Sequence, residues 1–337
     1  MQRKNHVNKA VLTMMTALLC LTASARNFRT QTHMPARNSV WAERMQQRIG
    51  FLSDTLCQGR GTGTAGGSEA AFWIARQFRD TGLIPLGRSW GKGFQTANGT
   101  IGHNIIGMFP GSVRNPADKY IIVAAHYDHL GVLNGKAYPG ADANASGTAA
   151  VTLLADMFTA MKAAGKTYGT SILFVGLDAN ELGQAGAAAL WESIKEGRLT
   201  DPLTGKRITR DKIMLMVNID QIGSTLAPVN TGREDYMIML GSHTLDIIRK
   251  DLLFSSNLTY DIGLDLCLSY YGSRQFTDLF WKISDQKIFA DNRIPAVMFT
   301  SGITMNNNKL RDKVSTLNME VLQKRIYLIY HWIERML

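Results

Sequence analysis

Short, almost continuous apolar segments alternate with amphipathic helical segments along most of this sequence. The segments predicted as strands are 104–108, 120–125, 171–177, 213–219, 236–240 and 296–300. The segments predicted as helices are 40–56, 68–81, 146–161, 183–194, 243–254 and 317–336. Strands that are apolar throughout are buried on both faces, so helices must cover both sides of their sheet. The pattern predicts a three-layer α/β fold, in which a mixed, mostly parallel sheet lies between helices.

The N-terminal segment has the pattern of an export signal. Basic residues at Arg3 and Lys4 precede an apolar run at 10–21, which is too short to span a membrane. A small-residue pattern at 23–25 then resembles a cleavage site. We therefore predict a signal peptide over residues 1–25, export to the periplasm or the extracellular space, and no transmembrane segment after its removal. No linker divides the remainder, so residues 26–337 are predicted to form one domain.

Composition and charge argue against a nucleic-acid-binding protein. The chain has 337 residues, of which 45% are hydrophobic and 19% charged, as in ordinary globular proteins. Its net charge is +10, but the basic residues are scattered and do not form a stripe with interleaved aromatic residues. Nucleic-acid binding is therefore not expected. Export would permit a disulfide between Cys57 and Cys267, and the sequence leaves open whether the two residues meet.

Polar residues follow three of the predicted strands within a few positions. His126 and Asp128 end the strand at 120–125, Glu181 follows the strand at 171–177, and Asp220 follows the strand at 213–219. In open α/β sheets, the functional groups gather at the carboxyl ends of the strands. A tight turn at 140–147 adds Asp142 at the start of a helix. These side chains are therefore expected to meet at one rim of the sheet.

One histidine and several carboxylates, without cysteine, suit zinc or a similar divalent ion. A carboxylate on a rigid turn, such as Asp142, could bridge two ions. Two ions about 3.5–4 Å apart can together orient a water molecule and polarise a carbonyl group. A single carboxylate at a strand end is usually a cap or a surface charge, so the prediction rests on the whole set.

At these residues the chain resembles the di-zinc aminopeptidases of metallopeptidase family 28, from about Cys57 to the C-terminus. The segment 126–131, His-Tyr-Asp-His-Leu-Gly, looks like the first metal motif of that family, and the segment 140–147 looks like its bridging-aspartate motif. The Gly-rich loop around Arg60, the segment 218–220 and the segment 294–296 fit as well. The resemblance implies the zinc-exopeptidase fold and an action on the N-termini of peptides or proteins.

The resemblance also implies a role for each matching residue. His126 and Asp220 would bind one zinc ion, Asp142 would bridge, and Glu181 would bind a second ion. Asp128 would orient His126 from behind, because a partner on the second ring nitrogen fixes the tautomer of a ligating histidine.

Two positions depart from the family pattern. Asn180 stands where relatives carry the general base, and an amide has no basic lone pair at neutral pH. General acid–base groups contribute roughly 10²–10⁴-fold to rate. Asn308 stands where relatives carry a late histidine ligand, when residues are counted from Gly302 without a gap. Gln286, in the segment Ser-Asp-Gln, also replaces a histidine found in many relatives.

These departures predict an altered metal site that holds one zinc ion or none rather than two. The favoured interpretation is an exported aminopeptidase-like protein whose hydrolysis is weak or lost. The alternatives are a non-catalytic peptide-binding relative and a glutaminyl-cyclase-like transferase. His129 is expected to be structural, although it is the only nearby imidazole that could replace the missing ligand. Ser146 is expected to cap the helix that follows it.

Overall fold

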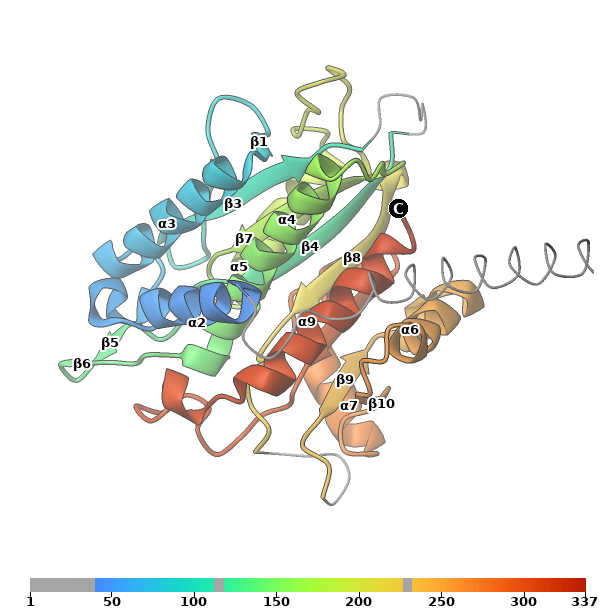
Figure 1. Ribbon diagram of the computed structural model, residues 1–337. Coiled ribbons are helices and arrows are strands. Elements are labelled where there is room, and N and C mark those ends of the chain that lie inside the picture. Colours follow the sequence, from blue (N-terminus) through green and yellow to red (C-terminus); the bar gives the residue numbers. More distant parts are fainter. Residues whose placement is uncertain (1–39, 112–117, 227–231) are drawn as a thin grey trace, which may run out of the picture.

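A nine-stranded sheet forms the centre of the molecule, seen here in a computed structural model that describes residues 40–111, 118–226 and 232–337 (Figure 1). The strand order is β1-β3-β7-β4-β8-β11-β9-β10, and β2 pairs with β3. The strands are β1 (Ile84–Pro85), β2 (Gly91–Gln95), β3 (Ile101–Phe109), β4 (Tyr120–His126), β7 (Ser171–Leu177), β8 (Ile213–Ile219), β9 (Tyr236–Leu240), β10 (Asp265–Cys267) and β11 (Ala296–Thr300). The predicted signal peptide lies outside the described residues.

The sheet is mixed, as predicted, with parallel pairing at its centre. β4 pairs in parallel with both β7 and β8, and β8 pairs in parallel with β11. β3 and β9 run antiparallel to their neighbours β7 and β11. Parallel neighbours need a crossover connection, which helices provide between the central strands. The carboxyl ends of β7, β4, β8 and β11 therefore lie along one edge.

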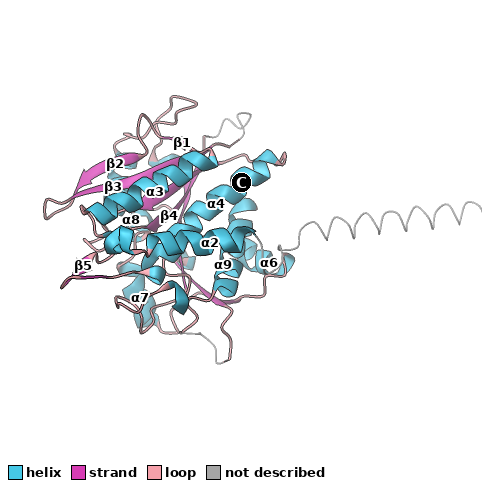
Figure 2. Ribbon diagram, turned by 60° about the vertical axis from the view of Figure 1, so that its left-hand side comes forward, coloured by secondary structure: helices cyan, strands magenta, loops and turns pink. Residues whose placement is uncertain are grey.

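Helices cover both faces of the sheet, and each face has its own apolar core. The helices are α2 (Val40–Leu52), α3 (Ala65–Thr81), α4 (Gly147–Ala163), α5 (Ala185–Lys195), α6 (Ile247–Thr259), α7 (Arg274–Lys282), α8 (Lys287–Asp291) and α9 (Met319–Glu334). Residues of α2, α3, α4, α6 and α9 join the larger core, and residues of α5 and α8 join the other (Figures 1 and 2). Successive side chains of β4 alternate between them: Val123 enters the larger core and Ile122 the smaller.

Six predicted strands are confirmed, and those at 171–177, 213–219, 236–240 and 296–300 are reproduced residue for residue. The start of α3 was predicted wrongly at Ser68. The helix begins at Ala65, and Thr64 caps it by accepting a hydrogen bond from the backbone N–H of Gly67. A Cβ on Gly66 would lie 2.1 Å from the carbonyl oxygen of Cys57. The glycines therefore belong to the helix because its first turn packs directly on backbone.

The start of α6 was also predicted too early, at residue 243. Asp246 caps this helix through a hydrogen bond from Arg249 N, and the residues before it form a 3₁₀ turn at Ser242–Thr244. Cys57 and Cys267 are both free in the structure. None of the helices in the described part of the chain is both long and apolar enough to cross a bilayer.

Candidate metal and peptide site

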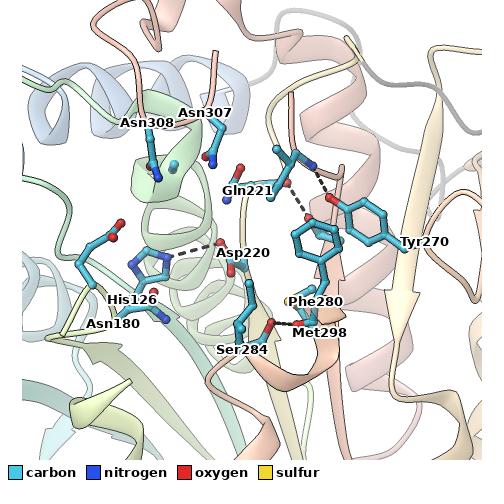
Figure 3. Close-up of a pocket in the computed structure, with 15 residues that line it drawn as sticks. His126, Asn180, Asp220, Gln221, Tyr270, Phe280, Ser284, Met298, Asn307 and Asn308 are labelled. Atoms are coloured by element: carbon cyan, nitrogen blue, oxygen red, sulfur yellow. Dashed lines mark hydrogen bonds and ion pairs between the residues drawn. The ribbon is translucent and has the colours of Figure 1, made fainter. Parts of the chain in front are cut away.

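The carboxyl ends of β4, β7 and β8 deliver polar side chains to one rim of the sheet, as predicted. His126 is the last residue of β4, and Asp220 follows β8 directly. A cavity of about 150 Å³ opens at this rim (Figure 3). Its polar wall includes His126, Asn180, Glu181, Asp220, Asn307 and Asn308. Its apolar wall includes Tyr270, Phe280, Ile283, Met298 and Ile303.

His126 lies between two aspartates at the base of the cavity. Its Nε2 lies 3.4 Å from Asp220 Oδ1, and its Nδ1 lies 3.1 Å from the backbone oxygen of Asp128. Burial lowers the pKa of His126, but Asp128 and Asp220 together outweigh that effect and hold the pKa well above 6.5. One ring nitrogen therefore faces the cavity side with Asp220, while the other is held from behind by Asp128.

Asp128 is fully buried and organises two segments at once. Its Oδ1 accepts a hydrogen bond of 3.0 Å from Asn180 N, and its Oδ2 accepts one of 3.0 Å from Glu181 N. Oδ1 also lies 3.5 Å from His126 Nδ1. The residue predicted to orient His126 thus positions the 180–181 segment as well, and this second task was not foreseen.

Asn180, at the position expected for a general base, faces the cavity with its amide engaged. Its Nδ2 donates a hydrogen bond of 3.0 Å to Oδ2 of Asp285. Burial raises the pKa of Asp285 to about 7, and its second oxygen is buried without a hydrogen-bond partner. Sequence reasoning noticed the Ser-Asp-Gln segment only for its missing histidine and overlooked Asp285. The acid itself was the available signal.

Asp142 sits deeper than the cavity wall, on the turn before α4. Its Oδ1 accepts hydrogen bonds from Gly223 N at 2.7 Å and from the hydroxyl of Ser146 at 3.1 Å. Burial, reinforced by the charge of Asp312, raises the pKa of Asp142 to about 7. Ser146 was expected to cap α4, but its hydroxyl makes no cap hydrogen bond. That hydroxyl is used instead to hold Asp142.

Glu181 meets a histidine that was expected to be structural. Its Oε1 lies 3.5 Å from Nδ1 of His129, whose ring is buried. Neither ring nitrogen of His129 has a hydrogen-bond partner. Burial lowers the pKa of His129, so the imidazole is neutral near pH 7.

Asn308, at the position of the expected late ligand, does reach the cavity. Figure 3 shows Asn307 and Asn308 pointing into the cavity toward His126 and Asp220. The backbone of Asn308 is left-handed, with φ at 55°, a conformation that asparagine tolerates better than most residues. Asn308 thus lines the cavity, while its correspondence to the late histidine of the family stays a prediction.

Arg60 holds the loops beneath the site together. The fully buried guanidinium donates hydrogen bonds to backbone oxygens of Leu52, Tyr127, Pro139 and Gly140. These carbonyls belong to the end of α2, to the loop after β4 and to the turn that carries Asp142. Burial lowers the pKa of Arg60 to about 10, so it keeps its charge at neutral pH.

Metal binding can be tested against this geometry. Within residues 40–111, 118–226 and 232–337, no three His, Cys, Asp or Glu side chains converge in an arrangement that could hold an ion. The candidates meet instead in two pairs, His126 with Asp220 and His129 with Glu181, separated by 3.4 and 3.5 Å. Two ligands of one tetrahedral zinc ion, each about 2.1 Å from it, lie about 3.4 Å apart.

Buried polar atoms without a hydrogen-bond partner also indicate an ion at this site. Asp220 Oδ1 and Asp142 Oδ2 are buried and accept no hydrogen bond. Buried polar atoms are normally satisfied, so orphaned ones call for an ion or a water molecule. The nitrogen and oxygen donors suit zinc. The residues present therefore fit the ion in pairs, and the predicted set of His126, Asp142, Glu181, Asp220 and Asn308 remains a prediction.

Comparison with known families finds one match. Residues 104–333 match the family model described as Peptidase family M28, which covers more than half of the chain. That segment contains His126, Asp142, Asn180, Glu181 and Asp220, together with most of the sheet. No curated protein sequence matches the chain.

Several solved structures share the fold. The LapA aminopeptidase of Legionella pneumophila superposes with a TM-score of 0.66 and 18% identity, covering 88% of this chain and 71% of that one. BSAP, a zinc aminopeptidase from Bacillus subtilis, gives 0.64 and 14%, covering 88% and 95%. The glutaminyl cyclase of Porphyromonas gingivalis gives 0.62 and 16%, covering 88% and 98%. Identities this low establish the shared fold alone.

Proposed function

The chain belongs to peptidase family M28, and from this premise we propose that it is an exported, aminopeptidase-like protein. It binds the free N-termini of peptides or proteins in the cavity at the carboxyl ends of β4, β7 and β8. It hydrolyses the first peptide bond slowly or not at all.

The observation that carries this proposal is the state of Asn180. The side chain lines the cavity, where a base would have to accept a proton from water, and it presents an amide. An amide oxygen can hold a water molecule but does not accept its proton at neutral pH. The amide nitrogen is already committed to Asp285. The site can thus orient a nucleophile without activating it in the usual way.

His126 and Asp220 are the residues that would hold one zinc ion most firmly. When bound, zinc polarises a carbonyl group and lowers the pKa of a bound water molecule. Asp128 fixes the ring of His126 through Nδ1 and leaves Nε2 directed at Asp220. Asp142, with one unpartnered oxygen beneath the cavity, is the residue proposed to bridge toward a second ion.

The rest of the cavity suits the end of a peptide. In the zinc-free protein, the carboxylates of Glu181 and Asp220 give one wall a negative charge, which attracts a terminal ammonium group. Tyr270, Phe280 and Met298 form an apolar wall that can receive the first side chain of the peptide. We therefore propose peptides with an apolar first residue as the ligand class.

Export to the periplasm or the extracellular space, with removal of residues 1–25, is part of the proposal and rests on the N-terminal sequence pattern. Measurements of binding and turnover also test two competing functions. A purely binding relative would retain peptides without turnover. A glutaminyl-cyclase-like enzyme would act on N-terminal glutamine. The support for this alternative is the fold that the chain shares with a glutaminyl cyclase.

The decisive experiment measures binding and turnover on the same preparation. Leucyl peptides with a free and with an acetylated N-terminus are titrated by calorimetry, and leucyl p-nitroanilide is assayed with zinc and with chelator. We expect the free peptide to bind at least about tenfold more tightly, because acetylation removes the ammonium charge.

Turnover should be slow or absent and should fall further with chelator. Turnover at the level of ordinary enzymes, with a kcat near about 10 s⁻¹, would contradict the proposed loss of activity. Equal binding of both peptides would contradict the N-terminal specificity. Release of ammonia from glutaminyl peptides would favour the cyclase.

A further inference from the structure

His129 is the least explained side chain at the site. The residue is 2% exposed, and neither Nδ1 nor Nε2 has a hydrogen-bond partner within the described structure. A neutral imidazole offers one donor and one acceptor, and burial without partners is unfavourable for both. Buried polar atoms are normally satisfied by a protein group, a water molecule or an ion, so the two ring nitrogens are candidate ligand atoms.

The spacing between His129 and the carboxylate of Glu181 suits shared coordination of an ion rather than a hydrogen bond. Nδ1 of His129 lies 3.5 Å from Oε1 of Glu181. Hydrogen bonds between nitrogen and oxygen cluster at about 2.7–3.2 Å. A separation of about 3.4 Å is that of two ligands on one tetrahedral ion. The same spacing, 3.4 Å, separates His126 Nε2 from Asp220 Oδ1.

The position of the His129 ring is determined by the backbone around it. The N–H of His129 donates a hydrogen bond to the carbonyl oxygen of Arg60. A Cβ on Gly140 would lie 2.5 Å from Cδ2 of the ring, so only glycine leaves room for the imidazole there. Arg60 in turn binds the carbonyl of Gly140. The imidazole is therefore held in one orientation before any ion arrives, which is a requirement for a ligand.

From this geometry we propose that His129 and Glu181 form a second metal site, in which His129 replaces the histidine missing at position 308. The inference rests on the proposed function, since it assumes zinc at His126 and Asp220. Asn308 lines the same cavity and adds only a weak amide ligand. Asp128 lies against the second ring nitrogen of His126, whereas neither ring nitrogen of His129 has a hydrogen-bond partner, so the second site binds zinc more weakly than the first.

Metal titration of the purified chain tests this proposal without reference to activity. Zinc-free protein is dialysed against increasing free zinc and analysed for bound metal, and cobalt titration follows the visible absorption of each bound ion. We expect two phases in the wild type, with the second at least roughly tenfold weaker. His129→Ala should remove the second phase and leave the first.

His103→Ala is the matched control, because His103 is an exposed histidine outside the cavity and should leave both phases intact. Glu181→Gln conserves volume and should weaken the second phase by more than the roughly 10–100-fold that is typical for loss of a residue that only orients a ligand, because it removes a direct ligand. Glu181→Gln also tests the proposed site if His129→Ala fails to fold. Circular dichroism and thermal melting would reveal such a failure.

The outcomes separate the two proposals. Loss of the second phase in both His129→Ala and Glu181→Gln supports the site. One phase in the wild type, or a second phase that survives in a folded His129 or Glu181 variant, overturns it while leaving the first ion in place. Absence of both phases overturns zinc binding altogether and, with it, the metal part of the proposed function.

Discussion

Nδ2 of Asn180 donates a hydrogen bond of 3.0 Å to Oδ2 of Asp285, a residue 105 positions further along the chain. The contact joins the loop after β7 to the segment between α7 and α8. This hydrogen bond fixes the amide of Asn180 against the buried carboxyl group of Asp285. The amide nitrogen of Asn180, the residue predicted to stand in place of a general base, therefore has a structural partner in Asp285.

Restoring the two altered positions together should recover activity. Asn180→Glu returns a carboxylate to the cavity, and Asn308→His returns an imidazole ligand beside it. We expect hydrolysis of leucyl p-nitroanilide to rise at least roughly tenfold, a cautious value for regaining a general base. Asn180→Gln with Asn308→His is the matched control, because it has the same side-chain length without the acid. Equal rates for the two double variants would contradict a base role at position 180.

Asp285 should make stability depend on pH. Its pKa is about 7 in the folded protein and 3.8 as an ordinary aspartate. The folded state therefore holds the proton to a higher pH than the unfolded state, and the residue costs stability increasingly between about pH 4 and pH 7. Asp285→Asn removes that cost and keeps an oxygen that can accept from Asn180.

Urea unfolding of both proteins in chelator, from pH 4 to pH 8, measures the effect. The advantage of Asp285→Asn over the parent should grow up to about pH 7 and then level off. A difference between the two midpoints that stays constant over this range would show that the acid does not titrate there.

Replacing Asp128 should damage the metal site and the fold together. The two oxygens of Asp128 accept hydrogen bonds from Asn180 N and Glu181 N. Asp128→Asn leaves one of these buried donors facing an NH₂ group, at a cost of about 1–3 kcal/mol in the free energy of unfolding. Zinc affinity should fall about 10–100-fold, as for other residues that orient a metal ligand. Denaturant unfolding and zinc dialysis check the two effects, and unchanged zinc affinity would exclude the orienting role.

Arg60 should be among the most sensitive positions outside the cavity. Arg60→Ala would remove the guanidinium donor from five backbone carbonyls, those of Leu52, Tyr127, Pro139, Gly140 and Ala143, of which Gly140 keeps a second donor in Ala145 N. We expect a loss of at least about 3 kcal/mol in the free energy of unfolding, because orphaned buried carbonyls add to a cavity. Arg60→Lys keeps the charge and recovers only part of the loss, since an ammonium group lacks the planar fork. Guanidinium unfolding of both variants measures the difference, and a loss below 1 kcal/mol for Arg60→Ala would contradict it.

Local patterns in the sequence were enough for the sheet and for the location of the site. The apolar runs at 171–177 and 213–219 are strands with those same limits, because a strand buried on both faces must be apolar along its whole length. His126 and Asp220 could be placed at one rim for a similar reason. Parallel strands end at the same edge, and adjacent polar residues must follow them there.

Helix starts were less predictable, because a cap depends on what the first turn touches. Thr64, rather than Ser68, caps α3, since Gly66 and Gly67 pack against backbone that precedes the helix. Ser146 looked like a cap, yet its hydroxyl serves Asp142 and the N–H of Ile222. The sequence shows which residue types can cap, and tertiary contacts decide which of them is free to do so.

The sequence by itself determined the α/β framework, the family and the identity of the amides at positions 180 and 308, because these follow from local pattern and from gap-free spacing. Only the tertiary structure decided what those residues touch. It joined Asn180 to Asp285 and set His129 beside Glu181, pairs whose members come from different segments of the chain. Distances between such side chains follow from how strands and loops pack, and packing is a property of the whole chain rather than of any local run of residues.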